Sequence, residues 1–446
     1  MTPIGRVVSV YGTRIVRISV ESNLLNEVSR PGTYIKIPVN DISLYGLILG
    51  FSLIDEFYKR VGSPSRIEGY EGLDLSRNEV NACLVGYRDE NGLHRGVILL
   101  PRPGSKVYML SDDEYREIMS RGDINIGSLV VKPSIPVSID MNGLLSRHFA
   151  ILAMTGAGKS NLVALLLMRI LEKYSKSRIL LIDTHSEYLD LHSYVRDKLQ
   201  LKSSVYCPRE YKVVGFAEDL EVPYWLLSLE EMYSILNLDS KATKQRLILR
   251  AALKKLRGED RVDEPVFFEL KALNDIIERD GRDRSADELK AKLDDFASNK
   301  DLKFISSPRA SLSRFKELKD KLGDYINASY AFAREFMERL LGNNLSIIAL
   351  GGLPFEAQDT VVSTILRLLW QFIVKERIER GVYYPTLIVI EEAHVYASGH
   401  RASSSREIIS RIAREGRKFG ISLGLVSQRP RELYEAVLSQ CGNLMH

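Results

Sequence analysis

Short apolar stretches rich in β-branched residues recur through the first 140 residues of the chain, and glycine-containing turns separate them. The run at 5–20 is a clear case, since Gly12 divides it into two strand-like halves. Many short strands with such turns are typical of a small barrel or sandwich. The runs that predict strands here are 5–20, 32–39, 45–54, 81–87 and 96–101. We expect an extended linker at 132–143, so the first domain is predicted to span residues 1–140.

The pattern changes near Arg147, where continuous apolar runs begin to alternate with helical stretches. Continuous apolar runs are typical of buried parallel strands, and their alternation with helices predicts an α/β doubly wound sheet. The expected strands lie at 149–153, 178–183, 212–216, 345–350, 386–394 and 421–428. A charged, helical stretch without a convincing strand occupies about 226–342, and we interpret it as a helical insertion in a second domain at 141–446.

Composition limits the functional classes without choosing among them. The chain is 45% hydrophobic and 27% charged, as expected for a globular protein, and no apolar run is long enough to span a bilayer. Three cysteines and seven histidines are dispersed without metal-ligand spacing, which favours a cytoplasmic protein without a zinc site. A formal net charge of +4 neither demands nor excludes a nucleic-acid partner.

The stretch from Ala153 to Ser160 resembles a phosphate-binding loop between a strand and a helix. Backbone N–H groups of such a loop point at phosphates, the lysine (Lys159) reaches the β- and γ-phosphates, and the hydroxyl (Ser160) holds Mg²⁺. The predicted nucleotide-binding residues are Thr155, Gly156, Ala157, Gly158, Lys159, Ser160 and Asn161. Alanine replaces the usual first glycine, and it is tolerated at Ala153 if its φ stays negative.

Acidic and polar residues follow three of the expected strands. Glu391 and Glu392 end the run at 386–392; Glu391 is assigned to the Mg²⁺ shell and Glu392 to activation of the attacking water. Asp183 ends a neighbouring strand and is predicted to orient water or brace the metal site, because open α/β sheets bind ligands at this edge. Gln428, at the end of another strand, is a candidate sensor of the γ-phosphate.

Basic residues are concentrated near the C-terminus, where eight lie between Arg401 and Arg431 beside only two acids. An arginine that a neighbouring subunit supplies to the γ-phosphate accelerates hydrolysis strongly in other systems. Arg417 is the first candidate for this role and Arg414 the second, with a solvated basic face as the alternative. The basic run at 241–257 also has two interpretations: it is a surface for DNA or another subunit, or it is a solvated helix.

Taken together, the motifs resemble those of the HerA branch of the HerA–FtsK superfamily. The stretches that carry the resemblance are RHFAILAMTGAGKSN, LLIDTHSEY, LIVIEEAH, IAREGRKFG and SQRP, with fainter signatures in IGRVVSV and RGVILLPRPGSKVY. The resemblance implies a RecA-like, ASCE-type P-loop ATPase core behind a small N-terminal β-barrel, using ATP and Mg²⁺. It also implies a homo-hexameric motor on double-stranded DNA, often paired with a NurA-like nuclease in DNA repair.

Several residues match the family one by one. Lys159 and Ser160 match its nucleotide loop, Asp183 its acid after the second strand, and Glu391 with Glu392 its paired acids. Arg417 matches an arginine that acts on the adjacent subunit, and Arg147 a basic position near the nucleotide.

This chain departs from the family pattern at Ala153, at Thr184 and Ser186, where the family has proline and glycine, and at its C-terminal end, which is expected to be truncated. Two other functions fit the same motifs: an ATPase that moves protein, and a nucleotide-switched assembly platform with little turnover.

Overall fold

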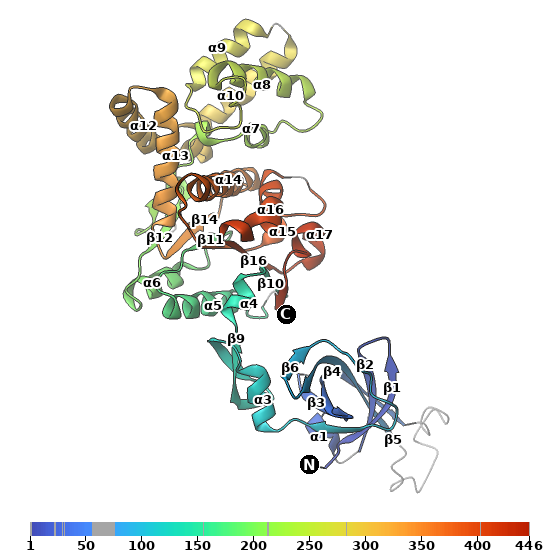
Figure 1. The fold of residues 1–446 in the computed structure, drawn as a ribbon. Coiled ribbons are helices and arrows are strands. Elements are labelled where there is room, and N and C mark those ends of the chain that lie inside the picture. Colours follow the sequence, from blue (N-terminus) through green and yellow to red (C-terminus); the bar gives the residue numbers. More distant parts are fainter. Residues whose placement is uncertain are drawn as a thin grey trace. The chain divides into compact units, whose positions relative to one another are not determined.

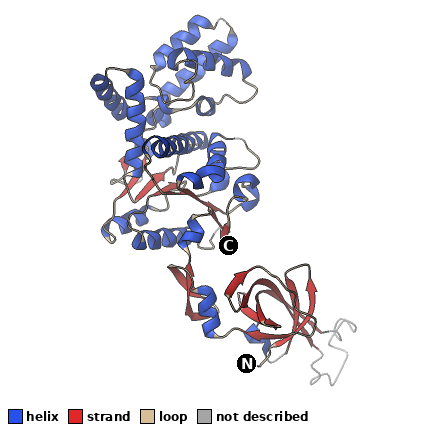
Figure 2. Cartoon of the chain, in the orientation of Figure 1, coloured by secondary structure: helices blue, strands red, loops and turns tan. Residues whose placement is uncertain are grey.

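The computed structural model describes residues 2–21, 24–28, 30, 32–55, 76–154, 156–211, 214–281, 283–401 and 403–445. The chain forms two compact units, Met1–Asp140 and Met141–His446. Strands dominate the first unit, whereas the second combines strands with many helices (Figure 2). Within the described ranges, none of the helices has the length and apolar character needed to cross a membrane.

The first unit contains an antiparallel barrel whose sheet order is β2-β1-β7-β3-β4-β5-β6, and an additional β2–β5 pairing closes it. Its strands are β1 (Gly5–Tyr11), β2 (Ile15–Val20), β3 (Tyr34–Val39), β4 (Ile42–Asp55), β5 (Ser76–Asp89), β6 (Gly92–Arg95) and β7 (Lys106–Met109). Alternate side chains, such as Val16, Ile18, Ile35 and Ile37, point inward and are buried, as the period of two requires. The barrel prediction is therefore confirmed.

Two predictions for the first unit are wrong. The apolar run at 96–101 is a loop in which Ile98, Leu99 and Leu100 are 58%, 42% and 46% exposed. The expected linker at 132–143 instead forms β9 (Lys132–Ile139), which pairs antiparallel with β8 (Ile124–Leu129), and then the start of α4 (Met141–Leu145). In the described part of this unit, the short helices are α1 (Leu25–Val28) and α3 (Asp112–Met119).

The second unit is built on an eight-stranded sheet with the order β13-β12-β14-β11-β15-β16-β10-β17. Its strands, which all pair in parallel, are β10 (Phe149–Leu152), β11 (Ile179–Asp183), β12 (Ser203–Cys207), β13 (Glu218–Asp219), β14 (Leu345–Ala349), β15 (Thr386–Ile390), β16 (Ile421–Ser427) and β17 (Asn443–Met445). Figure 1 shows α5 (Lys159–Lys173) and α6 (Leu189–Asp197) on one side, and α14 (Phe355–Arg380) and α16 (Ser404–Glu415) on the other. The α/β prediction is confirmed.

The sheet differs from expectation at two strands. The strand predicted at 212–216 does not form over its described residues 214–216, and β12 at Ser203–Cys207 lies beside β14 instead. Residues 212 and 213 lie outside the described part. Strand β17, which was not predicted, adds to the edge of the sheet by pairing with β10.

A helical segment fills the interval between β13 and β14. Its helices are α7 (Leu229–Ile235), α8 (Thr243–Arg257), α9 (Leu270–Asp280), α10 (Arg284–Ser298), α11 (Lys303–Ser306), α12 (Arg309–Leu322) and α13 (Tyr325–Leu341). A buried ion pair joins this segment to α14, since Glu231 on α7 accepts hydrogen bonds from Arg367 at 2.7 and 3.0 Å and from Ser363 at 2.8 Å. The segment is thus anchored to a helix that covers the sheet.

Candidate functional site

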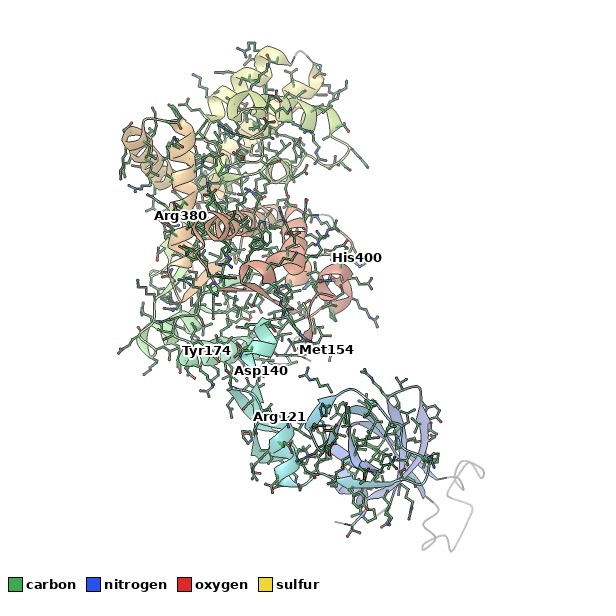
Figure 3. The ribbon with its side chains drawn as sticks, viewed as in Figure 1. Arg121, Asp140, Met154, Tyr174, Arg380 and His400 are labelled. Atoms are coloured by element: carbon green, nitrogen blue, oxygen red, sulfur yellow. The ribbon has the colours of Figure 1, made fainter. Side chains whose placement is uncertain are left out.

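The loop after β10 has the backbone conformation that phosphate binding requires. Gly156 and Gly158 have φ values of 80° and 82°, a region that residues with a side chain adopt at a cost. Ala153 has no positive φ, so the missing first glycine leaves the turn out of the strand intact. Met154, labelled in Figure 3, is 79% exposed beside this loop. Thr155, a predicted nucleotide-binding residue, lies outside the described residues.

Helix α5 begins at Lys159, directly after Gly158, so its first unpaired N–H groups face the loop. Such a helix N-terminus, with Gly156 and Ala157 just before it and Asn161 in its first turn, favours the binding of anionic phosphate. The ammonium group of Lys159 contacts Oε1 of Glu392 and lies 3.9 Å from Oε1 of Glu391. The phosphate loop and the residues after β15 are therefore brought together at the carboxyl ends of the parallel strands.

The hydroxyl of Ser160 lies between two carboxylates. It donates to Oε2 of Glu187 at 2.8 Å and lies 3.4 Å from Oε1 of Glu391. The Oε2 atom of Glu391 is buried and has no hydrogen-bond partner among the described residues, and burial raises the pKa of this carboxyl to about 7. A hydroxyl beside a buried carboxylate oxygen without a hydrogen-bond partner is a donor set that fits Mg²⁺, which prefers oxygen ligands.

No group of three or more His, Cys, Asp or Glu side chains in the described ranges forms a metal site by itself. Mg²⁺ in nucleotide sites is commonly held by one or two carboxylates together with the phosphates. Glu187 was not predicted as a site residue. Its hydrogen bond with Ser160 depends on the conformation of the loop after β11, which a motif in the sequence does not reveal.

Asp183, at the end of β11, is fully buried and is hydrogen-bonded to the loop that follows the strand. Its two carboxylate oxygens accept the backbone N–H groups of Glu187 and Tyr188, both at 3.0 Å. Burial raises the pKa of Asp183, although these backbone hydrogen bonds act in the opposite direction. Asp183 thus fixes the loop that carries Glu187, and no hydrogen bond or ion pair found in the described part joins it to Lys159 or Ser160.

Glu392 occupies an unusual backbone position at the start of α15 (Ala393–Tyr396). Its φ of 47° is rare for a residue with a side chain and is typical of functional sites. On its far side lies His394, whose Nδ1 is 3.2 Å from Oε2 of Glu392 and 3.1 Å from Oγ of Ser427. Gln428 follows Ser427, whose carbonyl accepts the N–H of Ala153 at 3.2 Å, so Gln428 adjoins the phosphate loop.

Arg147 and Arg417, the two arginines with predicted nucleotide contacts, lie at the amino ends of the parallel strands, whereas the phosphate loop lies at the carboxyl ends. Arg147 precedes β10, and Arg417 lies in the turn that precedes β16. Burial lowers the pKa of the neighbouring His148, and the charge of Arg417 acts in the same direction. Lys159 follows the other end of β10, and β16 is about 20 Å long at roughly 3.3 Å per residue. The fold therefore separates Arg147 and Arg417 from the phosphate loop of their own chain. Arg414 lies one turn earlier, in the last turn of α16.

The sequence of this chain is similar to those of several known proteins. The family model described as "Helicase HerA, central domain" matches residues 124–369. A probable helicase of Methanocaldococcus jannaschii is 31% identical over 440 residues, which cover 96% of this chain and 79% of that protein. The DNA double-strand break repair helicase HerA of Sulfolobus acidocaldarius is 28% identical, with coverage of 94% and 79%.

Solved structures provide a more distant comparison. VirB4 of Thermoanaerobacter pseudethanolicus aligns with a TM-score of 0.47 and 15% identity over 73% of this chain and 84% of that chain. The matched central domain and the 31% identity with the Methanocaldococcus jannaschii protein show the family. The chain belongs to the HerA helicase family.

Proposed function

We propose that this protein is an ATP-driven motor that moves along double-stranded DNA. The observation that carries the proposal is the convergence of Lys159, Ser160, Glu391 and Glu392 at the carboxyl edge of one parallel sheet. These groups supply what ATP hydrolysis needs: a phosphate-binding cation, ligands for a metal ion, and a carboxylate that positions water.

ATP binding has to break the contact between Lys159 and Glu392. The phosphates attract the ammonium group of Lys159, and the carboxylate of Glu392 is then free to accept a hydrogen bond from the attacking water. Ser160 and Glu391 would hold Mg²⁺, which when bound neutralises phosphate charge. Asp183 fixes the neighbouring loop through two backbone hydrogen bonds, and Gln428 adjoins the phosphate loop, where it senses the γ-phosphate.

Arg417 acts on the ATP of a neighbouring subunit in this proposal. Its position at the amino edge of the sheet keeps it away from its own phosphate loop, and Arg147 shares that edge. Several relatives are named DNA double-strand break repair helicases, which supports DNA as the track and a role in break repair. We infer a homo-hexamer that works with a NurA-like nuclease.

The test is the ATPase rate with and without linear duplex DNA, at low and at high salt. We expect duplex DNA to stimulate the rate several-fold, and the stimulation to fall as salt rises, because non-specific contacts with phosphates are salt-sensitive. An ATPase that is indifferent to DNA at every salt concentration contradicts the proposal and favours a motor that moves protein. Negligible turnover in wild type and in Glu392→Gln alike favours a nucleotide switch.

A further inference from the structure

Glu392 lies between two basic side chains, and the proposed reaction uses only one of them. Lys159 contacts Oε1, and the imidazole of His394 approaches Oε2 from the other side at 3.2 Å. Glu392 and His394 are 5% and 8% exposed, so water screens this approach poorly. Burial lowers the pKa of His394 and outweighs the opposite effect of the Glu392 charge, so the ring is neutral near pH 7.

The two contacts of His394 Nδ1 differ in their geometry. The contact with Oγ of Ser427 at 3.1 Å is a hydrogen bond, whereas the approach to Glu392 is close but not aligned, and Oε2 has no hydrogen-bond partner among the described residues. A neutral ring with its proton on Nδ1 can donate to only one of the two oxygens at a time. Ser427 is the present partner, and Glu392 is the alternative within the same reach.

Release of Lys159 changes the balance between these alternatives. While Lys159 contacts Oε1, the charge of Glu392 is compensated without help from His394. Once ATP draws Lys159 to its phosphates, Glu392 is a buried carboxylate that has lost its cation, and a buried charge without hydrogen bonds is costly. Nδ1 of His394, 3.2 Å from Oε2, supplies a donor when the ring carries its proton on that nitrogen. Ser427 can lose this donor, because its Oγ also accepts the N–H of Arg429 at 3.0 Å.

We propose that His394 is the positioning residue for Glu392: when ATP takes Lys159, Nδ1–H of His394 turns from Ser427 to Oε2 and holds the carboxylate toward the attacking water. This inference rests on the proposed ATP hydrolysis. The same movement links the catalytic carboxylate to the end of β16, where Ser427 precedes Gln428. The carbonyl of Ser427 also accepts the N–H of Ala153 in the phosphate loop. Occupancy of the nucleotide site is thereby transmitted to the neighbouring strand.

The experiment compares two variants whose side-chain amide nitrogen takes the place of one or the other nitrogen of the imidazole ring. In His394→Asn the side-chain amide replaces Nδ1, and in His394→Gln it replaces Nε2. We expect His394→Gln to lower kcat about 10- to 100-fold, the range that misplacement of a catalytic group produces. The KM and the affinity for an ATP analogue should stay within about twofold, which also shows that the variant is folded. His394→Asn should retain most of kcat.

The Glu392→Gln background separates a positioning role from a structural one. If His394 acts only through Glu392, adding His394→Gln to Glu392→Gln should change the residual rate less than twofold. His394→Ser, which is small and too short to reach Oε2, provides the same comparison if glutamine is not accommodated.

Two outcomes overturn the inference: wild-type kcat in His394→Gln and His394→Ser, or equal losses in the asparagine and glutamine variants. These outcomes leave the proposed function intact as long as Glu392→Gln alone is inactive. A fully active Glu392→Gln instead overturns the proposed function.

Discussion

Lys159 and Glu392, 233 residues apart in the chain, are in contact at the carboxyl ends of the strands in the eight-stranded sheet. One belongs to the phosphate loop and the other to the strand end two positions away in the sheet order. The pair neutralises two groups that both serve the triphosphate in the proposed reaction. Their separation is therefore the first event that a bound nucleotide has to cause.

Replacing Glu392, the proposed catalytic carboxylate, tests whether the reaction depends on this pair. Glu392→Gln keeps the shape of the side chain but cannot accept a proton from water, so we expect kcat to fall at least about 100-fold. Binding of ATP should persist or tighten, because Lys159 no longer has an anionic partner to leave. Steady-state ATPase assays and titration with a fluorescent ATP analogue provide the two readouts. A matched decline in binding and turnover would point to misfolding instead.

Glu187 is predicted to contribute to metal binding through its position beside Ser160. Glu187→Gln removes one negative charge near the metal site, so we expect several-fold weaker binding of Mn²⁺ in the presence of an ATP analogue, measured by calorimetry. Asp190→Asn, an equivalent change at the exposed first turn of α6, should leave Mn²⁺ binding unchanged. If both variants bind Mn²⁺ like wild type, the hydrogen bond between Ser160 and Glu187 has no role in metal binding.

Arg417→Ala is predicted to inactivate the protein and to be rescued by a second inactive variant. Because Arg417 lies far from Lys159 of its own chain, a mixture of Arg417→Ala with Lys159→Ala should regain part of the ATPase rate at mixed interfaces. Each variant alone should lose about 10³-fold or more. Arg414→Ala, in the preceding turn, is the matched comparison. Rescue of Arg414→Ala, with near-normal activity of Arg417→Ala, would assign the role to Arg414 instead.

The ion pair between Glu231 and Arg367 is predicted to control acid stability. Burial alone would raise the pKa of Glu231, but Arg367 and the hydrogen bonds from Ser228 and Ser363 outweigh it and hold this pKa below its ordinary value of 4.5. A depressed pKa stabilises the fold above the unfolded value, and this contribution is lost as the pH falls through the folded value.

Glu231→Gln should therefore lower the free energy of unfolding at pH 7 by about 3 kcal/mol, because the charge of Arg367 stays buried without its partner. The difference from wild type should shrink as the pH falls from about 4.5 through the lower folded pKa, where the wild-type pair is itself lost. Urea denaturation followed by circular dichroism at several pH values measures both effects. Glu230→Gln, whose partner Arg246 belongs to an exposed pair, should cost less than about 1 kcal/mol at any pH.

Contiguous motifs made the positions of the proposed catalytic residues predictable. Gly158, Lys159 and Ser160 act through a local turn whose conformation their own sequence dictates, and the acids of β15 follow a strand that is apolar throughout. Glu187 and His394 were missed because their partners, Ser160 and Ser427, come from distant parts of the chain. Such contacts depend on loop conformation and not on spacing.

The incorrect strand predictions have a related cause. The run at 96–101 is as apolar as a strand, but Ile98, Leu99 and Leu100 are exposed, and apolar character alone does not distinguish these cases. At β12, in contrast, a strand forms where none was predicted. Ser203 and Ser204 make this segment less apolar than residues 212–216, yet its place in the sheet is decided by pairing with β14. Tertiary partners, which a single sequence does not display, determined both outcomes.

The position of Lys159 and Arg417 at opposite edges of one sheet also restricts how copies of the chain can associate. If one edge of a subunit offers the phosphates and the other offers the arginine, the productive contact is head-to-tail and joins two different surfaces. A two-fold symmetric pair brings identical surfaces together and cannot complete either reaction centre. The assembly must then have a direction, so that every subunit serves the neighbour on one side and depends on the neighbour on the other.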